Sequence, residues 1–141
     1  MAVTHAILAD MQSDDTLSPD LTDAGYLERI SFIVELAEHL HAYGTTVQRL
    51  EGAIESAARR LGLECEPWVN PTGMVLAFND PSRPAGMSDT TRVLRLGSGN
   101  TDLYRLCETD RIAEEVVVGT LDVPAGRAAL RVLMRAAGWR S

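Results

Sequence analysis

The sequence predicts an α+β fold: an antiparallel helix pair, then a three-stranded and mostly antiparallel sheet, then two C-terminal helices. Apolar residues recur at three- and four-residue steps in residues 26–61, as they do on amphipathic helices. Short apolar segments separated by glycine, proline and asparagine follow in residues 63–96, as in a meander of strands. At 141 residues, the chain has the length of one domain with its own core.

The N-terminal segment, residues 1–25, differs from the rest of the chain. It contains five aspartates interspersed with serine and threonine, and few apolar residues that could stabilise an ordered backbone. We therefore expect a disordered acidic tail over residues 1–25 and a folded domain over residues 26–141.

The first helix is predicted over residues 26–43, with an apolar stripe and a narrow solvated face that includes Arg29, Glu38 and His39. His39 and His41 are two residues apart, so on a helix they point in different directions and cannot share a metal ion. Gly44 can adopt the left-handed conformation that ends a helix. The stripe consists of Leu27, Ile30, Ile33, Val34, Ala37 and Leu40.

The second helix is predicted to begin with a capping box made by Thr45 and Gln48, and to end at Gly62. Small residues at Ala53 and Ser56 allow the neighbouring helix to approach closely. The predicted apolar stripe consists of Val47, Leu50, Ile54, Ala57, Ala58 and Leu61.

Three strands are predicted next. The first covers residues 63–69, where Pro67 either interrupts the hydrogen-bond ladder or marks an edge strand. A turn at residues 70–73 leads into a continuous apolar strand over residues 74–78. We expect this second strand to be covered on both faces. A proline-containing loop, residues 79–89, precedes the third strand at residues 90–96.

The segment 97–102 contains two glycines but lacks the third glycine of a dinucleotide-binding loop, and the chain contains no lysine for a phosphate-binding loop. A turn with a helix N-cap at Asn100 or Thr101 accounts for it. The following helix is expected to bury Leu103, Leu106, Cys107, Ala113, Val116 and Val117 and to end at Gly119. A last helix opens near Pro124.

Composition excludes several classes of function. The net charge of −7 and pI of about 4.9 argue against a nucleic-acid partner, because such partners require a basic face. Cys65 and Cys107 lie in different predicted elements and form no metal-binding pattern, so we expect no metal site and no cofactor. No segment approaches the ~20 apolar residues that span a bilayer.

No catalytic constellation stands out, and we assign no catalytic residues. A hydrolase-like site can be imagined around His41, Thr46 and Glu51, because Gly44 would hold them near one helix junction. Helix capping and solvation already account for each of these residues. A stand-alone small enzyme with a site around His41 and Thr46 remains the alternative function.

The run from Gly44 to Glu51, the helix end at Leu61-Gly62-Leu63, Pro71 and the strand at residues 74–78 together resemble a known family. They resemble the soluble N-terminal domain of the threonine/serine exporter family, and the resemblance covers roughly residues 26–135. It implies a cytoplasmic domain at the inner face of the membrane that takes part in amino-acid efflux. Exporters of that family carry their transport path in membrane helices. The resemblance therefore implies a membrane-embedded exporter subunit as partner, or a membrane domain missing from this chain.

The positions that match the family motif are Gly44, Thr45, Thr46, Arg49 and Glu51. The resemblance implies threonine or serine as the ligand. Arg49 suits a carboxylate and Glu51 an ammonium group, the two charges of an amino acid. A surface ion pair between the two side chains is the alternative for these residues.

Overall fold

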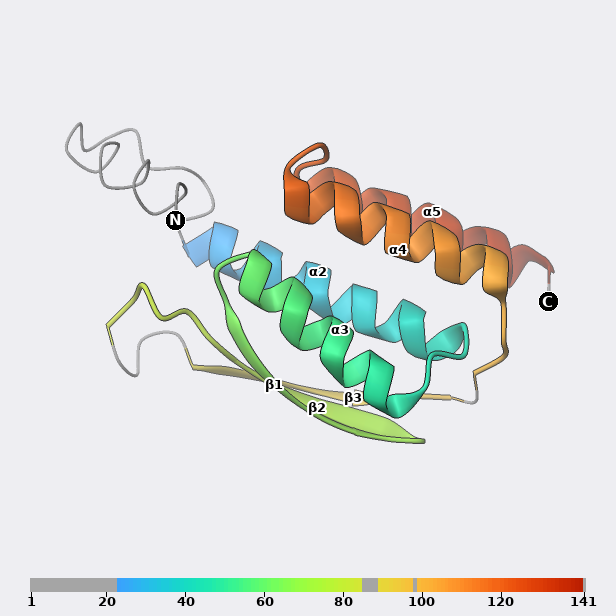
Figure 1. The fold of residues 1–141 in the computed structure, drawn as a ribbon, viewed down its shortest axis with the longest axis horizontal. Helices are drawn as coiled ribbons and strands as arrows, with labels where there is room; N and C mark the ends of the chain where they lie inside the picture. Colours follow the sequence, from blue (N-terminus) through green and yellow to red (C-terminus); the bar gives the residue numbers. More distant parts are fainter. Residues whose placement is uncertain (1–22, 85–88, 98, 141) are drawn as a thin grey trace.

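The structure is a computed structural model that describes residues 23–84, 89–97 and 99–140. Residues 1–22, which make up most of the predicted acidic tail, lie outside the described residues, and the first helix begins at Asp23. The elements are helices α2 (Asp23–Ala42) and α3 (Val47–Arg60), strands β1 (Glu64–Asn70), β2 (Gly73–Asn79) and β3 (Thr90–Arg95), and helices α4 (Leu103–Val118) and α5 (Val123–Arg140). This order confirms the predicted α+β fold. The elements form three layers: the sheet, then α2 with α3, then α4 with α5 (Figure 1).

The corner between α2 and α3 is formed by hydrogen bonds of the backbone. Gly44 has a left-handed φ of 96°, its N–H donates to His41 O at 3.2 Å, and the Thr45 N–H donates to Leu40 O at 3.0 Å. This is the Schellman pattern that ends a helix, as predicted for Gly44. It binds Thr45 to the end of α2. The N-cap of α3 is therefore Thr46, whose Oγ1 accepts the Arg49 N–H, and the predicted capping box of Thr45 and Gln48 is wrong.

Helix α3 packs against α2 and the sheet through four buried residues of the predicted stripe: Leu50, Ile54, Ala57 and Ala58. Val47, also predicted in the stripe, is 38% exposed because it lies in the first turn, beyond the edge of the core. The helix ends at Gly62, with φ 80°, as the sequence predicts.

The sheet has the order β1-β2-β3 with both pairs antiparallel, which confirms the predicted meander. Helices α2 and α3 cover one face, and Met74, Leu76 and Phe78 are buried under them (Figure 1). Val75, which points to the other face, is 36% exposed. The expectation that β2 is covered on both faces is therefore wrong, because the helices of the described chain all lie on one side.

Helix α4 begins one or two residues later than predicted, and its buried face agrees with the predicted one only in part: Val116 is buried as predicted. Its N-cap is Asp102, whose Oδ1 accepts the Arg105 N–H at 3.0 Å, and not Asn100 or Thr101. Leu103 is 71% exposed and Cys107 is exposed, contrary to expectation. The buried residues of α4 are Arg105, Thr109, Ile112 and Val116. Two of these are polar, which explains why an apolar pattern could not identify the face.

A buried ion pair joins the helical layer to the end of β2. Arg29, predicted on a solvated face, is 6% exposed and lies 3.1 Å from the Asp80 carboxylate. Its guanidinium also donates to Leu61 O at 2.7 Å, at the C-terminal end of α3. Burial alone would raise the pKa of Asp80, but hydrogen bonds from Ser82 and Arg29 outweigh burial and lower that pKa.

Candidate functional site

The loop before α4 packs directly against the corner between α2 and α3. The Asn100 N–H donates to Ala42 O at 3.0 Å, and the Asp102 N–H donates to Tyr43 O at 3.2 Å. The approach is so close that a Cβ at Gly99 would lie 2.4 Å from His41 O, and one at Gly44 would lie 3.0 Å from the Thr101 Cα. These contacts hold the start of α4 beside the start of α3.

A cavity of about 320 Å³ lies where these two helix starts meet. A second hollow of about 230 Å³ shares Leu40, Ala53 and Asp110 with it and continues between α3 and α4 as far as Arg60 and Val117. We call the two together the α3–α4 groove. The cavity at its corner end is lined by Leu40, Gly44, Thr45, Thr46, Arg49, Ala53, Thr101, Leu103, Leu106 and Asp110.

Two opposite charges face this corner cavity from different helices. Arg49 projects from α3 and Asp110 from α4, both exposed to solvent. Neither side chain forms a hydrogen bond or ion pair within the described part of the chain. A guanidinium binds a carboxylate through two parallel hydrogen bonds, and a carboxylate accepts from an ammonium group. The cavity therefore offers one partner for each charge of a small zwitterion.

Hydroxyl groups and apolar side chains complete the cavity. Thr45, Thr46 and Thr101 supply hydroxyls that can donate and accept hydrogen bonds. Leu40 and Leu106 supply apolar surface that excludes water from part of the wall. Polar groups placed on a partly apolar wall are the usual composition of a small-molecule site.

The structure brings four of the five predicted ligand-binding residues to this cavity: Gly44, Thr45, Thr46 and Arg49. Glu51 is not among its lining residues, because a step of two residues on a helix points side chains to nearly opposite sides. For the same reason Arg49 and Glu51 do not form the alternative surface ion pair. Asp110 provides the carboxylate instead. Sequence reasoning missed it because it lies on another helix and carries no local signal.

The hydrolase-like alternative finds no support in this geometry. His41 Nε2 lies 3.2 Å from Pro71 O, and neither His41 nor Glu51 lines the cavity that Thr46 lines. A nucleophile and its base must lie within hydrogen-bond reach of each other.

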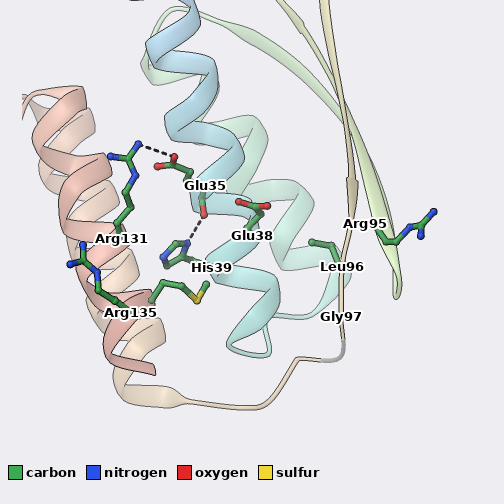
Figure 2. Close-up of a pocket in the computed structure, with 9 residues that line it drawn as sticks. Glu35, Glu38, His39, Arg95, Leu96, Gly97, Arg131 and Arg135 are labelled. Carbon is green, nitrogen blue, oxygen red and sulfur yellow. Dashed lines mark hydrogen bonds and ion pairs between the residues drawn. The ribbon is translucent and has the colours of Figure 1, made fainter. Parts of the chain in front are cut away.

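A second cavity of about 560 Å³ lies between α2, α5 and the end of β3. Figure 2 shows Glu35 and His39 on the side of α2 that faces Arg131 on α5, whereas Glu38 points away from α5. Three of its polar side chains have partners: Arg131 pairs with Glu35 at 3.4 Å, and both nitrogens of His39 lie 2.7 Å from carbonyl oxygens, those of Glu35 and Leu130. This arrangement joins α5 to α2.

Glu38, Arg95 and Arg135 also line the second cavity, and no partner binds their side chains within the described residues. Burial raises the pKa of Glu38, the nearby His39 opposes this, and Glu35 adds to it. The second cavity therefore also has unpaired groups of both signs, Glu38 and Arg135 among them. We nevertheless take the corner cavity as the candidate ligand site, because it is lined by four of the five positions predicted from the sequence, Gly44, Thr45, Thr46 and Arg49.

Within the described residues, no group of three or more histidine, cysteine, aspartate or glutamate side chains is arranged to hold a metal ion. Among the helices that the structure describes, none has the length and apolar character needed to cross a membrane.

The fold and the site define a small α+β domain with a polar cavity at a helix corner, lined by one positive and one negative side chain. The model of one protein family, described as "Putative threonine/serine exporter", matches residues 31–139. The chain therefore belongs to the threonine/serine exporter family, which confirms the resemblance seen in the sequence. No curated protein and no solved structure matches the chain.

Proposed function

We propose that this domain is an accessory or regulatory part of amino-acid efflux that acts with a membrane-embedded exporter subunit or domain. It works at the cytoplasmic side of the membrane and binds threonine or serine in the corner cavity. Membership of the exporter family supports the link to amino-acid transport. The observation that carries the ligand site is the pair of unpaired opposite charges, Arg49 and Asp110, that line the same cavity from different helices.

In the proposed complex, Arg49 binds the α-carboxylate of the amino acid in a bidentate manner, and Asp110 accepts from the α-ammonium group. The ligand hydroxyl exchanges hydrogen bonds with Thr46 or Thr101. The cavity volume of about 320 Å³ leaves room for a small amino acid and water. It lies at the lower end of the ~300–1,000 Å³ typical of small-molecule sites.

Such a ligand would bridge two layers of the fold. Arg49 belongs to α3 in the middle layer, and Asp110 belongs to α4 in the outer layer (Figure 1). A ligand held by both residues ties the outer layer to the corner of the middle layer. Binding therefore stabilises one position of α4, which is a route by which amino-acid concentration can be signalled to a membrane partner.

Isothermal titration calorimetry with threonine, serine and valine tests the ligand site. Valine matches the shape of threonine but lacks the hydroxyl, so we expect threonine and serine to bind more tightly than valine. Arg49→Gln and Asp110→Asn should each weaken binding at least ~tenfold, because each removes a charge-assisted contact worth about 1.5–3 kcal/mol. Arg59→Gln is the matched control on α3, since Arg59 is exposed and lies outside the cavity. If all three variants bind threonine as tightly as the wild type does, the proposed site is wrong.

A further inference from the structure

The open face of the sheet carries an apolar row where a solvated sheet normally presents polar side chains. Trp68, Val75 and Val93 lie directly opposite one another on β1, β2 and β3. They are 66%, 36% and 76% exposed. No described element lies on this side of the sheet (Figure 1). Exposed apolar surface of this kind marks a contact surface.

The register of the strands places two charges symmetrically around this row. Glu66 lies in the row formed with Ala77 and Thr91, which is the neighbouring row on the same face of the sheet, to one side of the apolar row. Arg95 lies in the row formed with Gly73, one step to the other side. Since Glu66 is on β1 and Arg95 on β3, they occupy diagonally opposite corners with Val75 at the centre.

Both charges are available for a partner. Glu66 and Arg95 are exposed, and neither forms an ion pair within the described residues. Arg95 also lines the second cavity at the end of β3, but its side chain extends away from α2 and α5, toward the uncovered side of the sheet (Figure 2). A hollow of about 290 Å³ at the acidic corner is lined by Glu64, Glu66 and Asp89 among others, and it can receive a guanidinium.

We propose that this face is the contact surface between two copies of the chain, related by a two-fold axis that lies in the plane of the contact. Such an interface is isologous: if residue i of one copy contacts residue j of the partner, then residue j of the first copy contacts residue i of the partner. An axis through the centre of the face, perpendicular to the line from Glu66 to Arg95, brings each Glu66 onto the partner's Arg95. The apolar rows then cross at the middle, near Val75.

The size of the face sets the expected affinity. Three strands about 4.8 Å apart, each about seven residues long at ~3.4 Å per residue, cover roughly 14 Å by 24 Å. The area of this face is smaller than the ~800 Å² that each partner buries in a standard interface. The dimer is therefore weak and forms at high local concentration. A shared membrane attachment would supply such a concentration. The contact leaves the α3–α4 groove uncovered in both copies, because the groove lies on the other side of the helical layer from the sheet.

A second copy fits this face better than the chain's own N-terminal segment. Residues 1–25 contain five aspartates and no arginine or lysine, whereas the acidic corner carries Glu64, Glu66 and Asp89. Like charges would meet there. In the dimer, each copy places its Arg95 guanidinium at the acidic corner of the other copy.

Sedimentation velocity over a wide range of concentrations of the full chain tests the proposal. The wild type should pass from monomer to dimer, and Val93→Arg should remain monomeric. Val132→Arg is the matched control, because Val132 is 60% exposed on α5, away from the sheet, and it should dimerise as the wild type does. Circular dichroism establishes that each variant is folded. A wild type that remains monomeric throughout overturns the proposal, as does a dimer that Val93→Arg leaves intact.

Charge reversal tests the two-fold arrangement with surface variants that preserve the core. Glu66→Arg and Arg95→Glu alone should each weaken the dimer by roughly tenfold or more, since each creates two like-charge contacts per dimer. The double variant restores both pairs with reversed sign and should recover most of the affinity. Failure of the double variant to recover would show that Glu66 and Arg95 do not meet, which contradicts the proposed dimer.

Discussion

The same substitution, glycine to alanine, should have opposite effects on stability at two helical positions. Gly52 lies on α3, where an added Cβ would meet nothing within 4 Å. Gly126 lies on α5, where an added Cβ would be 2.3 Å from Val116 Cγ2 and 3.1 Å from Phe32 Cε1. Phe32 is completely buried and Val116 is 5% exposed, so neither side chain can move freely. Gly126 is therefore the point where α5 touches both α4 and α2.

The magnitudes follow from two opposing effects. Alanine is favoured over glycine in a helix by about 1 kcal/mol, so Gly52→Ala should raise the free energy of unfolding by up to that amount. At Gly126 the same gain is opposed by overpacking of the core, which costs about 1–3 kcal/mol. Gly126→Ala should therefore be destabilising by about 0–2 kcal/mol, and the two variants should differ by about 1–3 kcal/mol.

Urea and thermal unfolding followed by circular dichroism measure this difference. For a domain of this size, 1 kcal/mol corresponds to roughly 3–5 °C in the midpoint temperature. We expect the midpoint to rise for Gly52→Ala and to stay level or fall for Gly126→Ala. Equal stabilisation of both variants would refute the packing of α5 against Phe32, and with it the placement of the outer layer that forms the α3–α4 groove.

Three further predictions concern titratable groups. Asp80→Asn leaves Arg29 buried without a counter-ion and should cost about 3–5 kcal/mol near neutral pH. Because the folded-state pKa of Asp80 is lowered from 3.8, its contribution is complete above that value and is lost as pH falls through the lowered pKa, so urea unfolding in acid should show a smaller difference. The pKa of Glu38 is raised from 4.5, chiefly by burial, so folding loses stability as pH rises through the raised value; Glu38→Gln should be more stable than the wild type at neutral pH and equal to it in acid. Cys107 is exposed, whereas burial raises the pKa of Cys65 to about 12, so thiol labelling of the folded chain should modify only Cys107 rapidly. Rapid labelling of two thiols would contradict the partial burial of Cys65.

Features set by local chemistry could be predicted from the sequence. Gly44 and Gly62 end their helices as expected, because a glycine after an apolar helical pattern is favoured in the left-handed conformation. The order of strands also followed from short segments and turn residues. Four of the five expected ligand-binding positions share a cavity because they lie within one helix start.

Features that depend on contacts between distant segments could not be predicted. The N-cap of α3 is Thr46 and not the predicted Thr45, because the hydrogen bond that ends α2 uses the Thr45 N–H. Arg29 is buried through Asp80, a partner 51 positions away in the chain. The orientation of α4, and so the position of Asp110 opposite Arg49, depends on how α4 packs in the outer layer.

The central claim, that a small hydroxy amino acid binds between Arg49 and Asp110, is tested most directly by nuclear magnetic resonance. Threonine added to ¹⁵N-labelled protein should shift the backbone amide signals of Thr46, Arg49, Thr101 and Asp110, the residues that surround the corner cavity. Signals around His39 in the second cavity should remain in place. Threonine that leaves every signal unmoved, or that moves only those near His39, would contradict the account.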